Sequence, residues 1–252
     1  MWTIKELKTR GMAAFQMNYW PCVLVGLILS LVGGATSGIG SIIGQLPRLI
    51  EWRISAGESL SQEDMFGADT AMTAVALDPE MTAIIAVVIG VMLLALGVAL
   101  LLGIFLLNPL YVGCSRFMKD NVIAPQKQFG ALKVGFSRYW HTVGTMLLTA
   151  VFVFLWSLLL LVPGIIKGYS YRMVPFLVAD HPELSATEVI TLSRRMMDGH
   201  KWNTFVLDLS FLGWILLTVL TCGILGIFWT TPYIANTNAA LYHKLKELGA
   251  GA

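Results

Sequence analysis

Long apolar runs alternate with short polar and basic segments along the chain, and a Trp stands at the start of three of these runs. The three copies are FQMNYWPCVLVGLIL from Phe15, FSRYWHTVGTMLL from Phe136 and GHKWNTFVLDLSFL from Gly199. In each copy the Trp separates polar or basic residues from an apolar stretch, and about 20 such residues suffice to cross a membrane as a helix. The repetition predicts a membrane protein assembled from similar helical units.

The second and third copies keep the same spacing after the Trp. Trp140 is followed 31 residues later by Tyr171, and Trp202 is followed 31 residues later by Tyr233. A Gly or Pro break divides each interval, at Pro163-Gly164 and at Cys222-Gly223. A unit of this length with a central break is typical of a helical hairpin that enters the bilayer and returns. The first copy fits the same unit with an insertion, and it closes at Tyr111.

The repeat predicts an all-α fold in which residues 1–252 form a single polytopic membrane domain of three pseudo-repeated hairpins. Hairpin one covers 15–111 with an outer loop at 47–80, hairpin two covers 136–181, and hairpin three covers 199–243. The first apolar run is longer than the segment of about 7–15 residues found in a cleaved signal peptide, so we expect it to be retained. The six membrane-spanning helices are expected near residues 22–46, 81–107, 141–162, 164–181, 203–222 and 224–243.

The composition supports a membrane protein and argues against a soluble domain, a nucleic-acid-binding protein and a metal site. The chain is 56% hydrophobic and 13% charged, and its mean hydropathy is +0.73, whereas an ordinary soluble domain has roughly 25% charged residues. A net charge of +2 is too small to indicate a nucleic-acid partner. The three Cys residues have neither CxxC nor Cys/His ligand spacing, so we expect no metal and no cofactor.

The distribution of basic residues predicts an orientation. If both termini and the open ends of all three hairpins are cytoplasmic, 14 of the 17 Lys and Arg residues lie on the inner side. The outer loop instead carries seven carboxylates. This bias follows the positive-inside rule and indicates a multi-pass protein of the bacterial cytoplasmic (inner) membrane. Trp20, Trp140 and Trp202 then lie at the inner interface, where a Trp ring anchors a helix.

The segments between the hairpins have the composition of amphipathic helices. Residues 112–138 mix five basic residues with aromatic and aliphatic ones, and 185–201 has Ser185 and Glu188 at the spacing of a capping box. We expect both segments to lie on the inner membrane face with their apolar sides toward the lipid. Their basic residues would attract anionic headgroups by about 1 kcal/mol each.

Small residues in the first span indicate close helix packing. Gly34 and Gly38 are four residues apart, as are Gly40 and Gly44. Inside a membrane such spacing lets a second helix approach closely. No strand precedes these glycines and no GK[ST] follows them, so we interpret them as a packing surface and not as a phosphate loop.

Charged residues inside the predicted spans are the strongest candidates for a site, because an ionisable group in the membrane is costly and is often functional. Asp208 lies in the fifth span, with Arg172 as its expected partner, and Asn236 and Asn238 could complete a polar cluster. Lys167 lies in the fourth span at a level that we expect to be closer to the outer side. Two interpretations stay open: a clamp that holds the hairpins together, and a site for a substrate or a proton.

Catalytic patterns are missing from the sequence. All four His residues fall at predicted helix ends, and no GxSxG or HExxH spacing occurs. The acidic residues of the outer loop are scattered among Ser, Gly and Ala. We therefore expect a protein that is not an enzyme.

Several segments together resemble a known family. They are LVPGIIK at 161–167, SRRMMDGHKW at 193–202, FLGW at 211–214 and WxxPY at 229–233. In combination they resemble the bacterial integral-membrane family called domain of unknown function number nine hundred and seventy-five. That family is distantly similar to the membrane domain of some glycerophosphodiester phosphodiesterases. The resemblance implies a lipid-related setting and assigns no residue a catalytic role.

Two functional hypotheses follow. The first is that the protein binds or moves an amphiphile, either a lipid or a membrane-active peptide, without catalysis. The second is that it is a structural or accessory membrane subunit that acts through a protein partner or a second copy of the chain. A cavity at mid-depth, lined by Asp208, Arg172 and Asn236, would favour transport, whereas a packed bundle would favour the accessory role.

Overall fold

The computed structural model describes residues 2–32, 79–124 and 129–249. The described residues are helical throughout, apart from short turns, and none of them lies in a strand, which confirms the all-α prediction. The four glycines of the predicted packing surface and residues 47–78 of the predicted outer loop lie outside the described residues.

The N-terminal elements are α1 (Ile4–Met17), a second helix (Tyr19–Val32), α3 (Pro79–Leu102), a π-helical turn (Gly103–Leu107) and α4 (Asn108–Ile123). A 3-10 turn (Phe129–Lys133), α5 (Val134–Ser137), α6 (Tyr139–Leu159), α7 (Leu161–Ser170) and α8 (Val174–Asp180) follow. The C-terminal elements are α9 (Ala186–Met196), α10 (Lys201–Leu209), α11 (Leu212–Leu220), a π-helical turn (Gly226–Thr230) and α12 (Thr231–Glu247).

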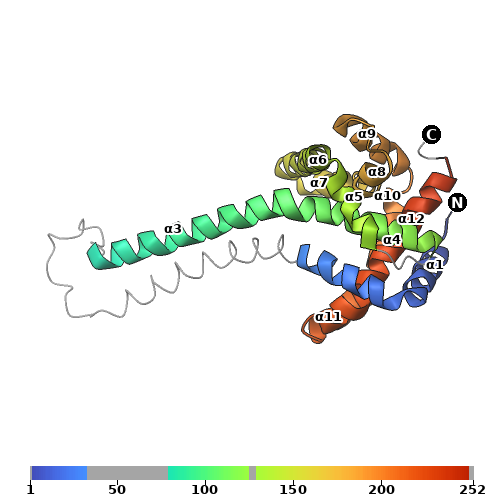
Figure 1. Cartoon of the computed structure of the whole chain (residues 1–252), viewed down its shortest axis with the longest axis horizontal. Helices are drawn as coiled ribbons and strands as arrows, with labels where there is room; N and C mark the ends of the chain where they lie inside the picture. The colour runs from blue at the N-terminus through green and yellow to red at the C-terminus, as the bar shows by residue number, and fades with distance from the viewer. Residues whose placement is uncertain (1, 33–78, 125–128, 250–252) are drawn as a thin grey trace. The chain divides into compact units, whose positions relative to one another are not determined.

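The chain divides into two compact units. One contains Met1–Gly33 and Gly103–Ala252, and the other is Gly34–Leu102. In the second unit the described element is α3, which carries apolar residues on all its sides and none of whose described side chains is buried. All other elements named above belong to the first unit (Figure 1).

Among the described residues, three helices are long and apolar enough to cross a membrane: Ala86–Ile123, Tyr139–Leu159 and Lys201–Leu220. A fourth span results if α1 and the helix Tyr19–Val32, which meet at an angle of 108°, count as one bent pair. These helices identify a membrane protein. They match the predicted spans near 81–107, 141–162 and 203–222.

The predicted continuous helix at 164–181 is wrong. The chain leaves the helical path between Ser170 and Val174, and α8 begins again with Pro175 in its first turn. Proline has no N–H to donate to the preceding turn and restricts the residue before it, so a helix tends to break at this point. The predicted span at 224–243 is continuous, but it starts as a π-helical turn before α12.

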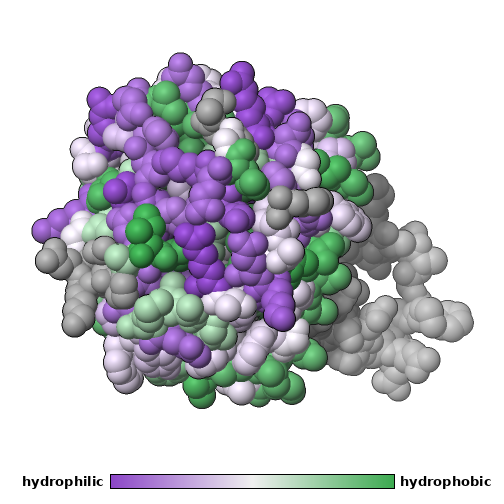
Figure 2. All heavy atoms as spheres, turned by 90° about the vertical axis from the view of Figure 1, so that its right-hand side faces the viewer, coloured by the Kyte–Doolittle hydropathy of each residue, from purple (hydrophilic) through white to green (hydrophobic). Residues whose placement is uncertain are grey.

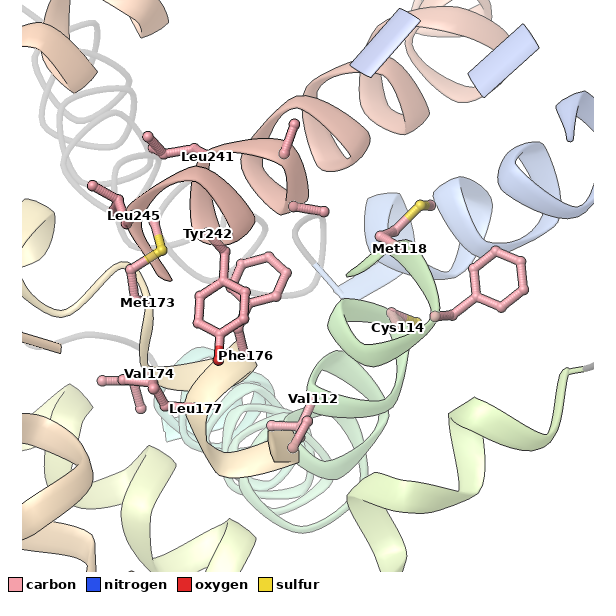
Figure 3. Packing of buried hydrophobic residues seen from close by; sticks show 14 of the residues in the cluster. Val112, Cys114, Met118, Met173, Val174, Phe176, Leu177, Leu241, Tyr242 and Leu245 are labelled. Carbon is pink, nitrogen blue, oxygen red and sulfur yellow. The ribbon is translucent and has the colours of Figure 1, made fainter. Parts of the chain in front are cut away.

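The buried core forms where α4, α8 and α12 pack together. Figure 3 shows side chains of all three helices converging, with the ring of Tyr242 stacked on Phe176 at a centroid distance of 5.2 Å. Residues 112–121 are therefore largely part of the core. Their basic residues had instead suggested a helix on the membrane surface. The polar side chains of α4 lie inside because they pair with partners from neighbouring helices.

The same positions are buried in each of these three helices. Counted from Tyr111, Tyr171 and Tyr233, the third, sixth and seventh residues all have at most a few per cent of their surface exposed. They are Cys114, Phe117 and Met118 in α4, Val174, Leu177 and Val178 in α8, and Asn236, Ala239 and Ala240 in α12.

The Trp-led copies also agree in local geometry. Asn18 (φ −136°, ψ 49°) and Arg138 (φ −120°, ψ 62°) break the helix immediately before a Tyr-Trp pair. In both copies the Tyr and Trp rings lie 5.4 Å apart at an interplanar angle of 78°. The second and fifth residues after each Trp are buried, whereas Trp20, Trp140 and Trp202 are 67%, 76% and 71% exposed. The exposed rings fit their predicted role as interface anchors.

Polar and apolar surfaces are separated within the first unit. The face on which both chain ends lie is largely hydrophilic (Figure 2). Large apolar side chains are instead exposed along α6 and α11, among them Phe154 and Leu158 in α6 and Leu216 and Val219 in α11. In water these side chains would be unfavourable on a surface, so they are suited to contact with lipid.

Candidate functional site

Arg172 and Asp208 form a bidentate ion pair. Arg172 Nη1 donates to Asp208 Oδ2 at 2.5 Å, and Nη2 donates to Oδ1 at 2.7 Å. Arg172 lies in the turn between α7 and α8, and Asp208 lies in the last turn of α10 before the break that precedes α11. Paired charge-assisted hydrogen bonds of this kind are strong and fix the relative orientation of the two groups.

Two further side chains complete this polar cluster. Tyr169 donates its hydroxyl to Asp208 Oδ2 at 2.9 Å, and Arg172 Nη2 also donates to Asn238 Oδ1 at 2.9 Å. The cluster thus connects α7, α10 and α12. The sequence had predicted Arg172, Asp208 and Asn238 together but not Tyr169, whose position near Arg172 depends on the short turn after α7.

Lys167 and Asn236 do not belong to this cluster. Lys167 Nζ lies over the ring of Trp156, 4.6 Å from its centroid, as expected for a cation–π contact. Asn236 is fully buried in a separate network, where its Oδ1 accepts a hydrogen bond from Asn121 Nδ2 at 3.0 Å. Spacing along a helix could not separate Asn236 from Asn238, because the two residues point in different directions around α12.

The second network joins three helices through asparagines. Asn121 at the end of α4 accepts a hydrogen bond from Asn18 Nδ2 at 2.8 Å and donates to the Ala14 carbonyl at 3.0 Å. The Cys22 thiol lies beside the same amide groups, 3.3 Å from Asn121 Nδ2. Since Asn18 forms the break before the Tyr-Trp pair, this network fixes the bend between the first two helices.

A third cluster is centred on Asp180, whose side chain is only 7% exposed. Its carboxylate accepts hydrogen bonds from Lys119, from Arg116 at 2.8 Å and from the Tyr242 hydroxyl at 2.7 Å. Lys246 lies 3.4 Å away. The cluster therefore links α4, α8 and α12 at one end of the core. Sequence reasoning missed it because Asp180 is about 60 positions from both Lys119 and Tyr242. Arg116 and Lys119 had also been predicted to lie on a helix at the inner membrane face.

Helix α1 is attached to α12 by ion pairs and by a close backbone approach. Lys244 pairs with Glu6 at 2.8 Å and Arg10 with Glu247 at 3.3 Å. The hydrogen bond from Lys244 lowers the pKa of Glu6 below its ordinary value. A Cβ at Gly11 would lie 2.5 Å from Thr237 Oγ1, so only glycine fits there.

A groove of about 690 Å³ is lined mainly by residues of α1. It is open to the surface and none of its residues belongs to the Arg172 cluster. Lys8 extends from the groove to the Ser210 carbonyl at 3.0 Å and over the Phe211 ring at 4.4 Å. The residues that line the groove are Ile4, Lys5, Lys8, Thr9, Met12, Ala13, Gln16 and Tyr233.

Helix α9 has the predicted capping box but not the predicted environment. The Ser185 hydroxyl accepts from the Glu188 N–H, and the Glu188 carboxylate accepts from the Ser185 N–H at 2.7 Å. The apolar face, with Val189 and Met196, is buried against α6 and α8 instead of facing lipid. Arg194 and Arg195 are exposed.

The four His residues lie at helix ends, as predicted, and contact groups of the chain itself. His141 Nε2 lies 2.7 Å from the Leu184 carbonyl, and His243 Nε2 lies 2.9 Å from the Lys119 carbonyl. Across 2–32, 79–124 and 129–249, no group of three or more His, Cys, Asp or Glu side chains has the arrangement needed for a metal ion.

One comparison with known proteins gives a match. The model of the family described as "Protein of unknown function (DUF975)" matches residues 141–249, which include α6 after its first two residues and all elements up to α12. Comparisons with curated proteins and with solved structures give no match. The resemblance seen in the sequence motifs is thus confirmed: residues 141–249 match the model of the DUF975 family, whose function is unknown.

Proposed function

We propose that the protein is a multi-pass protein of the bacterial cytoplasmic membrane that binds an anionic amphiphile, without catalysis, at its polar face. In this proposal the three Trp-led units are hairpins that span the membrane, and both termini are cytoplasmic. The first two copies agree in backbone angles and ring geometry, and all three agree in the buried positions after the Trp, which supports the repeat. The hydrophilic face at the chain ends supports the orientation.

The groove along α1 is the observation that carries this proposal. Its apolar residues Ile4, Met12 and Ala13 lie beside Lys5 and Lys8, so one opening offers both an apolar surface and positive charge. An amphiphile with a single acyl chain and an anionic headgroup has the complementary chemistry. A helix at the membrane surface, bent by 108° from the helix that follows, is well placed to receive such a molecule from the inner leaflet.

The Arg172 cluster supports binding at the surface over passage through the bundle. Both carboxylate oxygens of Asp208 and the guanidinium of Arg172 already have partners within the chain. A substrate would have to break these bonds before it could bind there. The cluster therefore has the properties of a clamp between hairpins, which was one of the two predicted alternatives.

Native mass spectrometry of the full chain in a mild detergent tests the proposal. We expect lysophosphatidylglycerol to be retained and lysophosphatidylcholine, which has no net charge, to be lost. Lys5→Gln should reduce the amount of lipid retained, and Ala13→Trp should reduce it further by filling the groove. Lys133→Gln, an exposed Lys outside the groove, serves as the matched control. Unchanged retention in Ala13→Trp would exclude the groove as the site.

The saturated polar clusters also favour a second candidate, a structural or accessory subunit. In that case the same purification would yield a stoichiometric protein partner, and neither lysolipid would be retained. The two outcomes are mutually distinguishable in one spectrum.

Labelling with a membrane-impermeant maleimide tests the orientation. Cys222 is exposed and is first changed to Ser, while Cys22 and Cys114 are buried. In intact cells whose outer layers are permeable to the reagent, Lys246→Cys should be labelled only after lysis. Thr221→Cys, in the turn after α11, should be labelled without lysis. The reverse pattern would overturn a cytoplasmic C-terminus.

A further inference from the structure

Three cations from different helices converge beside α7. The Ser193 hydroxyl donates to the Ser170 carbonyl at 2.9 Å in a buried contact, which places the neighbouring Arg194 next to the last turn of α7. Lys167 lies one turn earlier on α7. Arg194 follows the bonded Ser193 on α9, and Lys201 lies at the start of α10, which packs against α7.

The third helix is fixed to α7 by aromatic packing. Tyr169 and Phe205 lie 6.1 Å apart with their rings nearly perpendicular, and Tyr169 also bonds to Asp208. Phe205 lies one turn after Lys201 on the same side of α10, so this contact holds Lys201 close to α7. The convergence of the cations is therefore a property of the packed helices and not of one flexible side chain.

These charges lack sufficient counter-charge within the chain. Among the described residues, no carboxylate lies within ion-pair distance of Lys167 or Arg194. Lys201 has Asp198 at 3.7 Å, but the Asp198 side chain is 84% exposed and contributes little. Three cations held together at the level of membrane helices repel one another unless an anion joins them.

The surroundings are apolar and aromatic. Trp156, over which Lys167 lies, is 38% exposed, and so is Phe205. Trp202, next to Lys201, is 71% exposed and contacts Phe205 at a ring distance of 5.4 Å. Positive charge beside exposed aromatic rings matches a phosphate group that is joined to acyl chains. Basic pockets between membrane helices are known to bind anionic headgroups.

We infer that α7, α9 and α10 form a binding site for the headgroup of an anionic phospholipid, with Lys167, Arg194 and Lys201 contacting the phosphate. Exposed aromatic side chains of α6 and α10 lie along the acyl chains. This site shares no residue with the groove along α1, so it does not depend on the function proposed above.

Thermal unfolding of the full chain in detergent, with and without added phosphatidylglycerol, tests this site. The lipid should raise the melting temperature of the wild type but not that of the double variant Lys167→Gln/Arg194→Gln. The matched control is Arg195→Gln, which removes the same charge from the next position on α9 and should respond like the wild type. Without lipid, the double variant should melt no lower than the wild type, because the substitution removes repulsion.

Three results would overturn the inference. The first is an equal response of the double variant and the wild type to phosphatidylglycerol. The second is an equal response of the wild type to phosphatidylcholine, which would show that the charge of the headgroup is irrelevant. The third is full replacement of the lipid effect by inorganic phosphate, which would indicate a site for a free anion. Lys133→Gln, which lies outside both sites, should leave all of these measurements unchanged. Lys5→Gln tests the groove separately, so failure of the groove and failure of this site are separable.

Discussion

Arg172 and Asp208, 36 residues apart in the sequence, join two points at which helices are interrupted. Arg172 lies between α7 and α8, and Asp208 lies immediately before the break between α10 and α11. A bidentate pair between these two points restricts the relative positions of α7 and α10. Tyr169 adds a hydrogen bond to Asp208, and Asn238 accepts one from Arg172.

Asp208→Asn should destabilise the protein by about 3 kcal/mol, because the Arg172 guanidinium loses its counter-charge while it stays mostly buried. The value lies at the lower end for a buried pair, since the Asp208 side chain is one-third exposed. Thermal unfolding in detergent measures the loss. The double variant Arg172→Met/Asp208→Leu should recover part of it. A fully stable Asp208→Asn that has lost lipid binding would instead indicate that Asp208 serves a ligand.

Asp180→Asn should be more damaging than Asp208→Asn, and should lower the free energy of unfolding by about 3–5 kcal/mol. The Asp180 side chain is only 7% exposed and Lys119 only 8%, so the Lys119 ammonium would be left in the core with Asp120 at 3.4 Å as its remaining acid. Comparison of the folded yield of Asp180→Asn with that of Asp120→Asn checks this order. Equal yields would show that Asp180 is not the centre of the cluster.

Gly135→Ala should destabilise the contact between α5 and the start of α4. An added Cβ would lie 1.8 Å from the Pro109 carbonyl oxygen, and backbone atoms cannot move aside as a flexible side chain can. Overpacking of this kind costs about 1–3 kcal/mol. Gly144→Ala is the control, because a Cβ at Gly144 meets no atom within 4 Å. Its melting temperature should match or exceed that of the wild type.

The capping box of α9 should make part of the stability dependent on pH. The Ser185 N–H donates to the Glu188 carboxylate and lowers the pKa of Glu188 below its ordinary value of 4.5. A lowered pKa stabilises the folded state above pH 4.5, and this contribution is lost as the pH falls through the folded-state pKa. The difference in melting temperature between the wild type and Glu188→Gln should therefore be present at neutral pH and shrink in acid. A constant difference would exclude the carboxylate as its cause.

The sequence predicted the parts of the site that have a local or periodic signal. Trp20 and Trp140 could be predicted to lie at the start of a helix because each stands between a polar segment and an apolar run. The capping box could be predicted because Ser185 and Glu188 are three positions apart. Arg172 and Asp208 were paired because an isolated charge in a membrane helix needs a partner. This reasoning identifies which charged and polar side chains need a partner.

The sequence could not identify partners that are brought together only by tertiary packing. Arg116, Lys119 and Asp120 form a polar stripe at helical spacing, which usually indicates an exposed surface, but Asp180 and Tyr242 turn this stripe into part of the core. The asparagine network was missed for a similar reason, since Asn18 and Asn121 are 103 residues apart. The break after Ser170 was signalled by Pro175, but the long apolar run concealed it.

The packing of α1 against α12 has a consequence for biosynthesis. Arg10 and Glu247 are 237 residues apart, so α1 acquires its contacts with α12 only after nearly all of the intervening residues have left the ribosome. Until then Leu7 and Phe15 of α1, which are buried in the folded protein, lack part of their packing. Chains that stop before α12 should therefore present an unpacked N-terminal helix, which cellular proteases can recognise as a mark of incomplete synthesis.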